Sequence, residues 1–223
     1  NNRIFDWSLK VARRSAQIST EGKPAPPLLE LEREIADRLV FAKLRDAVGG
    51  RIQRMVSGGA ALPAELALIF TGAGIPILQG YGLTETSPVI AVNTLEHCRI
   101  GSVGRLLPGL ETKIAENGEI LTRGPHVFRG YFNKPGDTAA AFTDEPVASE
   151  RGFKTGDIGL FDADGYLFIT DRKKDLIKTS GGKYVAPQMI EGLLAQSEFV
   201  EQAVIVGDKR KYVSALIVPD FER

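Results

Sequence analysis

Residues 51–82 read RIQRMVSGGAALPAELALIFTGAGIPILQGYG, and their pattern decides the fold. The segment RIQRMVS alternates as a β-strand does, and SGGAAL leads into a short helix that begins near Pro63 and ends at Gly72 or Gly74. The following IPILQGYG predicts a buried strand. A strand, a helix and a strand joined by short links indicate a parallel α/β layer. In open sheets of this kind, ligands bind beyond the carboxyl ends of the strands.

The segments on either side of this unit complete a three-part organisation. Residues 29–48 carry apolar residues at 31, 35, 39, 40, 44 and 48, which predicts one amphipathic helix. After about residue 104, strand pairs joined by Asn-Gly and Asp-Gly turns predict a small antiparallel β subdomain. From about residue 174, a Gly-rich loop, a helix near 187–196 and two strands predict a third unit. We therefore expect an α/β fold: a parallel α/β layer in 1–104, antiparallel β structure in 105–173 and a partial α+β unit in 174–223.

Composition excludes several functional classes. Lys and Arg together number 28, as do Asp and Glu, so the net charge is zero and argues against a general nucleic-acid binder. The single cysteine, Cys98, cannot form an internal disulfide, and with only His97 and His126 it cannot complete a zinc cage. No uniform apolar run of membrane-spanning length and no signal segment occur. The chain opens inside a predicted helix without an initiator Met, so we expect a piece of a longer protein.

The stretch QGYGLTETSP, residues 79–88, is the first candidate for chemistry. Glycine at 80 and 82 lets the backbone approach a ligand, and the Tyr81 ring between them can stack on a base. Thr84 can donate to a phosphate oxygen, and Glu85 can bind Mg²⁺, which takes oxygen ligands. The alternative is a solvated turn after a strand.

Three further stretches also allow two interpretations. SGGAAL, at 57–62, could turn backbone N–H groups toward a ligand or be a tight connection. In FKTGDIG, Asp157 could accept hydrogen bonds from a ribose diol or be an ordinary turn residue. DRKKDLIKTSGGK, at 171–183, is either a solvated charged face or a hinge ahead of a flexible loop. It lacks the spacing of a phosphate-binding P-loop.

Taken in order, these stretches together with GSVGRLLPG, GEILTRGPHVFRGYFNKP and GFKTGDIGLFDADGYLFITDRKKDLIKTSGGKYVAP resemble the AMP-forming acyl-CoA synthetases of the adenylate-forming superfamily. Long-chain fatty acid–CoA ligases are the closest match, and the resemblance covers essentially the whole chain. It implies two half-reactions. A carboxylate attacks the α-phosphorus of MgATP to give an acyl-adenylate and pyrophosphate, and the thiol of coenzyme A then displaces AMP. The implied cofactors and substrates are ATP, Mg²⁺, coenzyme A and a fatty acid.

The resemblance also implies roles for individual residues in the nucleotide site. Tyr81, with Gly82 beside it, would lie against adenine, and Thr84 and Glu85 would contact the α-phosphate and magnesium. The remaining nucleotide-binding positions are Gly58, Gly59 and Ala60, which would line the site near the base and acyl group, and Asp157 and Arg172, which would hold the ribose hydroxyls.

Residues 174–223 would form the first part of a mobile C-terminal lid. Lys174 matches the hinge, and Lys178 would lie near the adenylate phosphate during thioester formation. Gly181, Gly182 and Lys183 resemble the segment that lines the pantetheine channel. Lid motion of this kind lets one site perform two reactions.

Two departures from the family pattern are visible. Phe153 stands where the fatty-acid ligase signature usually has Trp, which is a mild change. The Ser/Thr/Gly-rich phosphate loop and the lysine near the end of the lid do not occur in this sequence. We therefore expect that these 223 residues do not turn over alone and need an N-terminal part.

Two alternatives remain open. The first is a ligase that delivers its acyl-adenylate to a carrier protein, and the second is a non-catalytic nucleotide-binding fragment. For the ligase we expect no nucleic-acid partner and a cytoplasmic location, with peripheral membrane contact where fatty acids partition.

Overall fold

A computed structural model describes residues 2–20, 22–147 and 150–221. The chain divides into two compact units, described here one at a time. Unit 1 contains Asn1–Pro108 and Ala163–Leu167, and unit 2 contains Gly109–Asp162 and Phe168–Arg223. The domain limits expected from the sequence stay predictions. Asn1, with which the first helix was expected to open, lies outside the described residues.

The helices of unit 1 pack around a small apolar core. Val11, Leu29 and Phe41 are almost fully buried in it. A Cβ on Gly72 would overlap the backbone of Ala12, so this glycine lets two helices approach closely. The helical elements are α1 (Asn2–Thr20), α2 (Pro27–Ala36), the π-helical turn η1 (Asp37–Phe41), α3 (Ala42–Ala47) and α4 (Ala64–Gly72); α1 and α4 are in contact.

The helix expected over 29–48 is present as α2, η1 and α3, but only part of its predicted apolar stripe faces the core, where Val40 and Leu44 pack. Leu31, Ile35 and Leu39 are 44–54% exposed, whereas Leu29 and Phe41 are buried. Within α2 the buried residues are Leu29 and Ala36, seven positions apart, so Leu31 and Ile35 lie on another face of the same helix. The π-helical turn that follows, in which the N–H of Ala42 bonds back to the carbonyl of Asp37, adds one residue to the turn, so a regular 3.6-residue count does not continue from α2 into α3.

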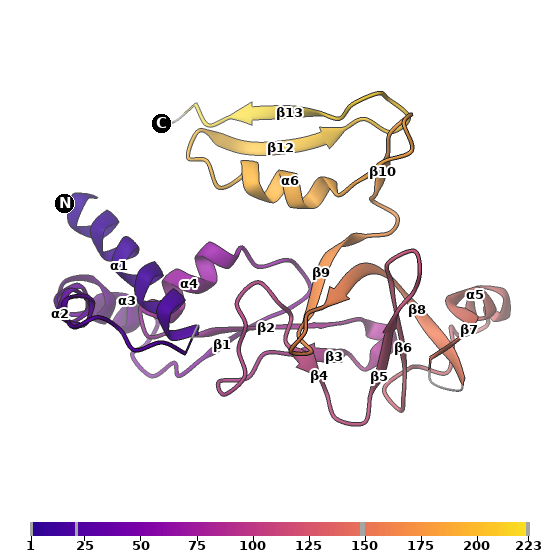
Figure 1. Ribbon diagram of the computed structural model, residues 1–223, viewed down its shortest axis with the longest axis horizontal. Helices are drawn as coiled ribbons and strands as arrows, with labels where there is room; N and C mark the ends of the chain where they lie inside the picture. The colour runs from indigo at the N-terminus through magenta and orange to yellow at the C-terminus, as the bar shows by residue number, and fades with distance from the viewer. Residues whose placement is uncertain (1, 21, 148–149, 222–223) are drawn as a thin grey trace. The chain divides into compact units, whose positions relative to one another are not determined.

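A four-stranded sheet continues unit 1, in the order β1-β2-β3-β4. Strands β1 (Met55–Ser57) and β2 (Ile77–Gly82) are parallel and are joined through α4, as Figure 1 shows. Strands β3 (Val89–Val92) and β4 (Arg105–Leu106) extend the sheet antiparallel. The predicted parallel α/β layer is therefore confirmed for β1, α4 and β2.

Unit 2 begins with a five-stranded antiparallel sheet in the order β5-β6-β8-β7, with β9 paired to β8. Its elements are β5 (Glu111–Ile114), β6 (Glu119–Arg123), α5 (Pro135–Ala141), β7 (Phe142–Val147), β8 (Glu150–Phe161) and β9 (Leu167–Arg172). Phe153, in the family's Trp position, is 3% exposed. It meets the rings of Phe128 and Phe142 edge to face at 5.5 and 5.8 Å, so the smaller aromatic is well packed.

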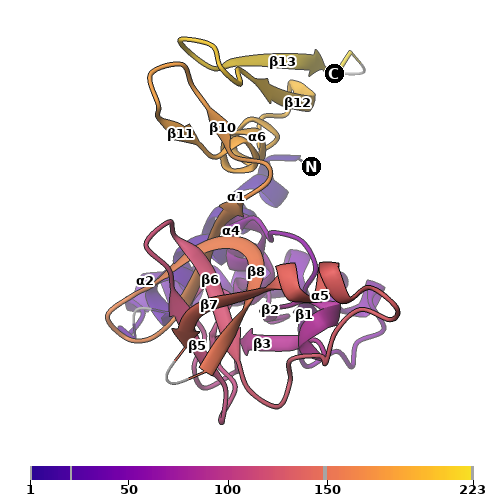
Figure 2. The same cartoon turned by 90° about the vertical axis from the view of Figure 1, so that its right-hand side faces the viewer.

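The remainder of unit 2 is α+β, as expected. It contains β10 (Ile177–Lys178), β11 (Tyr184–Val185), α6 (Pro187–Leu194), β12 (Val200–Val206) and β13 (Ser214–Pro219). Helix α6 lies along the β12–β13 hairpin (Figures 1 and 2), and the N–H of Ile205 donates to the Glu191 carboxylate (2.7 Å). Within the described part of the chain, none of the helices combines the length and apolarity that crossing a bilayer requires.

Candidate functional site

Two loops in unit 1 leave the same edge of the sheet, because β1 and β2 are parallel. The first contains Gly58, Gly59 and Ala60, all exposed, and the second follows Tyr81 and Gly82 at the end of β2. A Cβ built on Gly58 would lie 3.6 Å from the carbonyl oxygen of Gly80, so the first loop lies against the end of β2. The structure thus brings together the first two predicted stretches at the carboxyl edge of parallel strands, where α/β folds bind ligands.

A 3₁₀ turn, η2 (Thr84–Thr86), holds the polar residues of the second loop. Thr86 is fully buried and ties this turn together. Its hydroxyl accepts from the N–H of Leu83 (2.9 Å) and donates to the carbonyl of Pro88 (2.6 Å). With Thr86 as the anchor, Thr84 is left exposed and Glu85 half-buried at the rim of the sheet.

Gly82 has a role in the strand pairing of the chain itself. The register of β2 and β3 shifts between Tyr81 and Gly82, and a Cβ on Gly82 would overlap the carbonyl oxygen of Pro88. The hairpin alone explains why glycine is needed there. Its predicted contact with the nucleotide stays a prediction.

In unit 2, a bulge in β8 sets the direction of Asp157. Glu119 pairs with Ile158 and Leu121 with Lys154, so three residues of β8 lie opposite the single residue Ile120. Gly156 occupies the bulge with φ of +76°, a conformation that favours glycine. Bulges commonly redirect a side chain beside a binding site.

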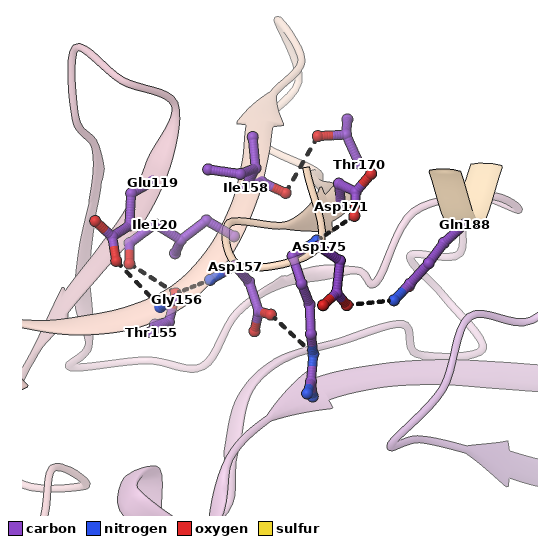
Figure 3. Close-up of polar contacts among 11 residues, drawn as sticks. Glu119, Ile120, Thr155, Gly156, Asp157, Ile158, Thr170, Asp171, Asp175 and Gln188 are labelled. Atoms are coloured by element: carbon purple, nitrogen blue, oxygen red, sulfur yellow. Dashed lines mark hydrogen bonds and ion pairs between the residues drawn. The ribbon is translucent and has the colours of Figure 1, made fainter. Parts of the chain in front are cut away.

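The side chain of Thr155 closes this bulge, as Figure 3 shows. Its hydroxyl donates to the carbonyl of Ile120 (2.8 Å) and accepts from the N–H of Asp157 (3.1 Å). Asp157 is 6% exposed, and its carboxylate lies 3.5 Å from Nε of the mostly exposed Arg172. The structure therefore brings Asp157 and Arg172 together, as a carboxylate and a guanidinium that could share one polar ligand.

Asp171, next to Arg172, is buried, and only one of its carboxylate oxygens has a hydrogen-bond partner among the described residues. Its Oδ1 accepts from the N–H of Arg172 (2.6 Å), whereas the buried Oδ2 has no hydrogen-bond partner among the described residues. Burial raises the pKa of the Asp171 carboxyl, and the nearby Asp175 and Glu191 raise it further.

The predicted hinge residue, Lys174, lies at the centre of a turn directly after β9. The N–H groups of Asp175 and Leu176 both donate to the carbonyl of Arg172 (3.0 and 3.2 Å). A short turn at the end of a strand is the kind of place where a few dihedral changes can swing a domain.

The loop after this hinge is closed by Thr179. Its N–H donates to the carbonyl of Lys183 (2.9 Å), and the N–H of Gly182 donates to the carbonyl of Thr179 (2.9 Å), with φ of +80° at Gly182. Gly181, Gly182 and Lys183 are exposed at the tip. Lys178 precedes the loop, and its ammonium lies 5.3 Å from the centre of the Tyr184 ring.

The chemistry of Glu85 fits a magnesium ion that is held mainly by its substrate. Mg²⁺ usually keeps several waters and takes one or two protein carboxylates together with substrate phosphates. No group of three or more His, Cys, Asp or Glu side chains in the described ranges could hold a metal by itself. A single half-buried carboxylate beside an exposed threonine is consistent with binding MgATP.

Sequence reasoning missed the residues that support the site. Thr86, Thr155 and Glu119 position the predicted residues through side-chain bonds to the backbone. Small hydroxyl residues in turns are a general signal of such bonds and would have pointed to Thr86 and Thr155. The sequence carries no comparable signal for Glu119.

The comparisons with known proteins agree with this geometry. The family model described as AMP-binding enzyme matches residues 17–132, and the model of the AMP-binding enzyme C-terminal domain matches residues 174–223. The chain therefore belongs to the AMP-binding enzyme family.

Among its relatives is a long-chain-fatty-acid–CoA ligase, FadD15, of Mycobacterium bovis, 44% identical over 220 residues. That match spans 99% of the chain and 36% of the relative. The chain thus spans little more than a third of the length of this ligase.

Solved structures lead to the same family. O-succinylbenzoate coenzyme A synthetase of Bacillus subtilis in complex with its acyl-adenylate intermediate matches with a TM-score of 0.68 and 30% identity, covering 81% of this chain and 40% of that one. The same synthetase in complex with ATP and magnesium matches with a TM-score of 0.65 and 29% identity, over 79% and 40%. The predicted family and α/β fold class are thus confirmed.

Proposed function

We propose that this chain is the C-terminal portion of an AMP-forming long-chain acyl-CoA synthetase. Such an enzyme activates a fatty acid with ATP and transfers the acyl group to coenzyme A. The observation that carries the proposal is the buried Asp157, aimed by a bulge and paired with Arg172, in a chain of the AMP-binding family. A carboxylate fixed in this way can accept hydrogen bonds from both hydroxyls of a ribose.

In the adenylation step, the residues of unit 1 would bind the adenine and phosphates. Tyr81 would lie against adenine, with the backbone of Gly58, Gly59 and Ala60 lining the site, and Thr84 would donate to the α-phosphate as negative charge develops there. Glu85 would hold Mg²⁺, which when bound neutralises phosphate charge. Asp157 and Arg172 would fix the ribose, and this positioning turns an encounter of two substrates into a reaction within one complex.

In the thioester-forming step, residues 174–223 would act as a lid that turns about Lys174. Lys178 would then lie near the adenylate phosphate and stabilise the AMP that leaves as the thiol attacks the acyl carbon. Gly181 and Gly182 would line a narrow channel for the pantetheine arm, and Lys183 would meet a phosphate of coenzyme A. The exposure of these three residues at the loop tip supports this assignment.

The proposed activity is tested on the ligase that contains this chain. With a long-chain fatty acid and ATP we expect pyrophosphate release that requires magnesium, and with coenzyme A we expect faster release of AMP. AMP release that coenzyme A leaves unchanged, but a carrier-protein thiol accelerates, would favour the acyl-carrier alternative. The absence of pyrophosphate release with any carboxylic acid would contradict the proposal.

Two further expectations, on turnover and on location, accompany this function. Residues 1–223 alone should show no turnover, because the sequence contains no Ser/Thr/Gly-rich phosphate loop. We also propose a cytoplasmic enzyme that contacts membranes peripherally while it takes up fatty acid. Flotation of the ligase with vesicles that contain fatty acid, compared with vesicles without it, tests the second expectation.

A further inference from the structure

The buried carboxylate of Glu119 contacts both segments that carry the proposed ribose-binding residues. Glu119 opens β6 and is 4% exposed. Its Oε1 accepts from the N–H of Gly156 in the bulge (3.2 Å), and its Oε2 lies 2.6 Å from Nζ of Lys173. Figure 3 shows Glu119 beside the bulge that precedes Asp157.

A third bond closes this arrangement into a ring. The N–H of Lys173 donates to the carbonyl of Gly156 (2.8 Å), so the bulge and the end of β9 are also joined to each other. Asp157 follows Gly156 directly, and Arg172 precedes Lys173 directly. Each member of the ribose-binding pair is therefore one residue away from an atom that bonds to Glu119.

A contribution to folding stability does not by itself explain why the buried Glu119 carboxylate occupies this position. Burying the Glu119 carboxylate costs several kcal/mol, and its pairing with Lys173, whose side chain is 45% exposed and screened by solvent, at best roughly offsets this cost, so the pair contributes little net stability. The Glu119 carboxylate instead fixes the positions of Gly156 and Lys173, because its two oxygens bind the N–H of Gly156 and the ammonium of Lys173 at the same time. Gly156 adopts its φ of +76° without strain, and the bond from its N–H to Glu119 holds the otherwise flexible glycine in one conformation.

We propose that Glu119 is a positioning residue for nucleotide binding, which aims Asp157 at the ribose hydroxyls and sets its spacing from Arg172. This inference rests on the proposed function, because it requires Asp157 to bind the ribose. Without the Glu119 carboxylate, the N–H of Gly156 loses its acceptor and the bulge relaxes. The backbone N–H of Lys173 remains bonded to Gly156, so the strand pairing persists. The side chain of Asp157, however, is no longer held in the direction of the ribose hydroxyls.

The test compares ATP with 2′,3′-dideoxy-ATP in the ligase that contains this chain. Glu119→Ala should raise the KM for ATP about tenfold, the loss of roughly one charge-assisted hydrogen bond, with little change in kcat. The variant and the wild type should use dideoxy-ATP equally well, because that nucleotide lacks the hydroxyls. In an Asp157→Ala background, Glu119→Ala should add nothing further.

A matched control lies on the same strand. Thr122 is fully buried, and its hydroxyl donates to the carbonyl of Glu111 (3.1 Å), away from the bulge. Thr122→Val should affect the two nucleotides alike. Glu119→Gln retains an oxygen that can accept from Gly156 and should restore part of the affinity for ATP.

Several outcomes would overturn the inference. If Glu119→Ala impairs the use of both nucleotides equally, or adds its full effect to that of Asp157→Ala, Glu119 is only structural. If that variant does not fold, Glu119→Gln and Lys173→Met are compared in the same way, and equal losses with both nucleotides again refute the role. A wild-type ligase that uses ATP and dideoxy-ATP equally well contradicts the proposed role of Asp157 itself.

Discussion

Replacement of Asp157 by alanine separates a binding role from a role in stability. Asp157 lies 3.5 Å from Arg172, whose side chain is 64% exposed, so solvent screens this ion pair. Although Asp157 itself is buried, a pair whose cation is open to solvent in this way contributes about 1 kcal/mol to unfolding. Two hydrogen bonds from ribose hydroxyls to a carboxylate are worth about 1.5–3 kcal/mol each. We therefore expect a loss of about 10²-fold or more in kcat/KM for ATP, with the free energy of unfolding changed by no more than about 1 kcal/mol.

The assay is pyrophosphate release by the full-length ligase at varied ATP, with urea unfolding of the same preparations. Asp164→Ala is the matched control, because Asp164 forms an exposed ion pair with Arg99 (2.7 Å). It should leave kcat/KM unchanged. If Asp157→Ala retains wild-type affinity for ATP, or loses activity only in proportion to its stability, the reasoning about the ribose is refuted.

Three further predictions concern the lid, pH and the helical core. Lys178→Ala should slow coenzyme A-dependent AMP release about 10²-fold and leave pyrophosphate release unchanged, as single-turnover assays can show. Burial lowers the pKa of His126 below its ordinary value of 6.5, so folding stability should decline as the pH falls from that value through the folded pKa, and His126→Gln should flatten this decline in urea unfolding. Arg45 pairs with Asp37 (2.7 Å) and donates to the carbonyl of Ala73 (2.8 Å), so Arg45→Met should lower the unfolding free energy by about 1 kcal/mol; an unchanged value would contradict this.

Turn chemistry and strand order could be predicted from local sequence. The strand–helix–strand order of residues 51–82 corresponds to β1, α4 and β2. The Asn-Gly and Asp-Gly turns contain Gly118 and Gly165 at φ of +82° and +80°. Such features depend on residues a few positions apart, which is why local patterns predict them.

Sequence patterns did not predict the buried face of the helix over 29–48 or the bulge in β8, because residue spacing departs from regularity in both elements. In α2 the buried face runs through Leu29 and Ala36, so the expected apolar positions 31 and 35 are exposed, and the π-helical turn at 37–41 then breaks the regular spacing. The bulge at Gly156 inserts residues opposite Ile120 and redirects Asp157. The bulge is a tertiary feature, because Glu119 accepts from the N–H of Gly156 and no local pattern identifies that partner.

The candidate residues came from resemblance, and the structure adds the contacts that hold some of them in place. The proposed ribose carboxylate, Asp157, could be named from the string TGD, but the bonds of Thr155 and Glu119 to the backbone of its bulge could not. The turn that presents Thr84 and Glu85 depends on the buried Thr86. Supporting contacts of this kind are visible only in coordinates.

A crystal structure of the full-length ligase with a non-hydrolysable acyl-adenylate analogue tests the account most directly. We expect both ribose hydroxyls within hydrogen-bond distance of the Asp157 carboxylate, with adenine in contact with the ring of Tyr81. A nucleotide bound elsewhere, or bound with its ribose facing solvent and away from Asp157, would contradict it.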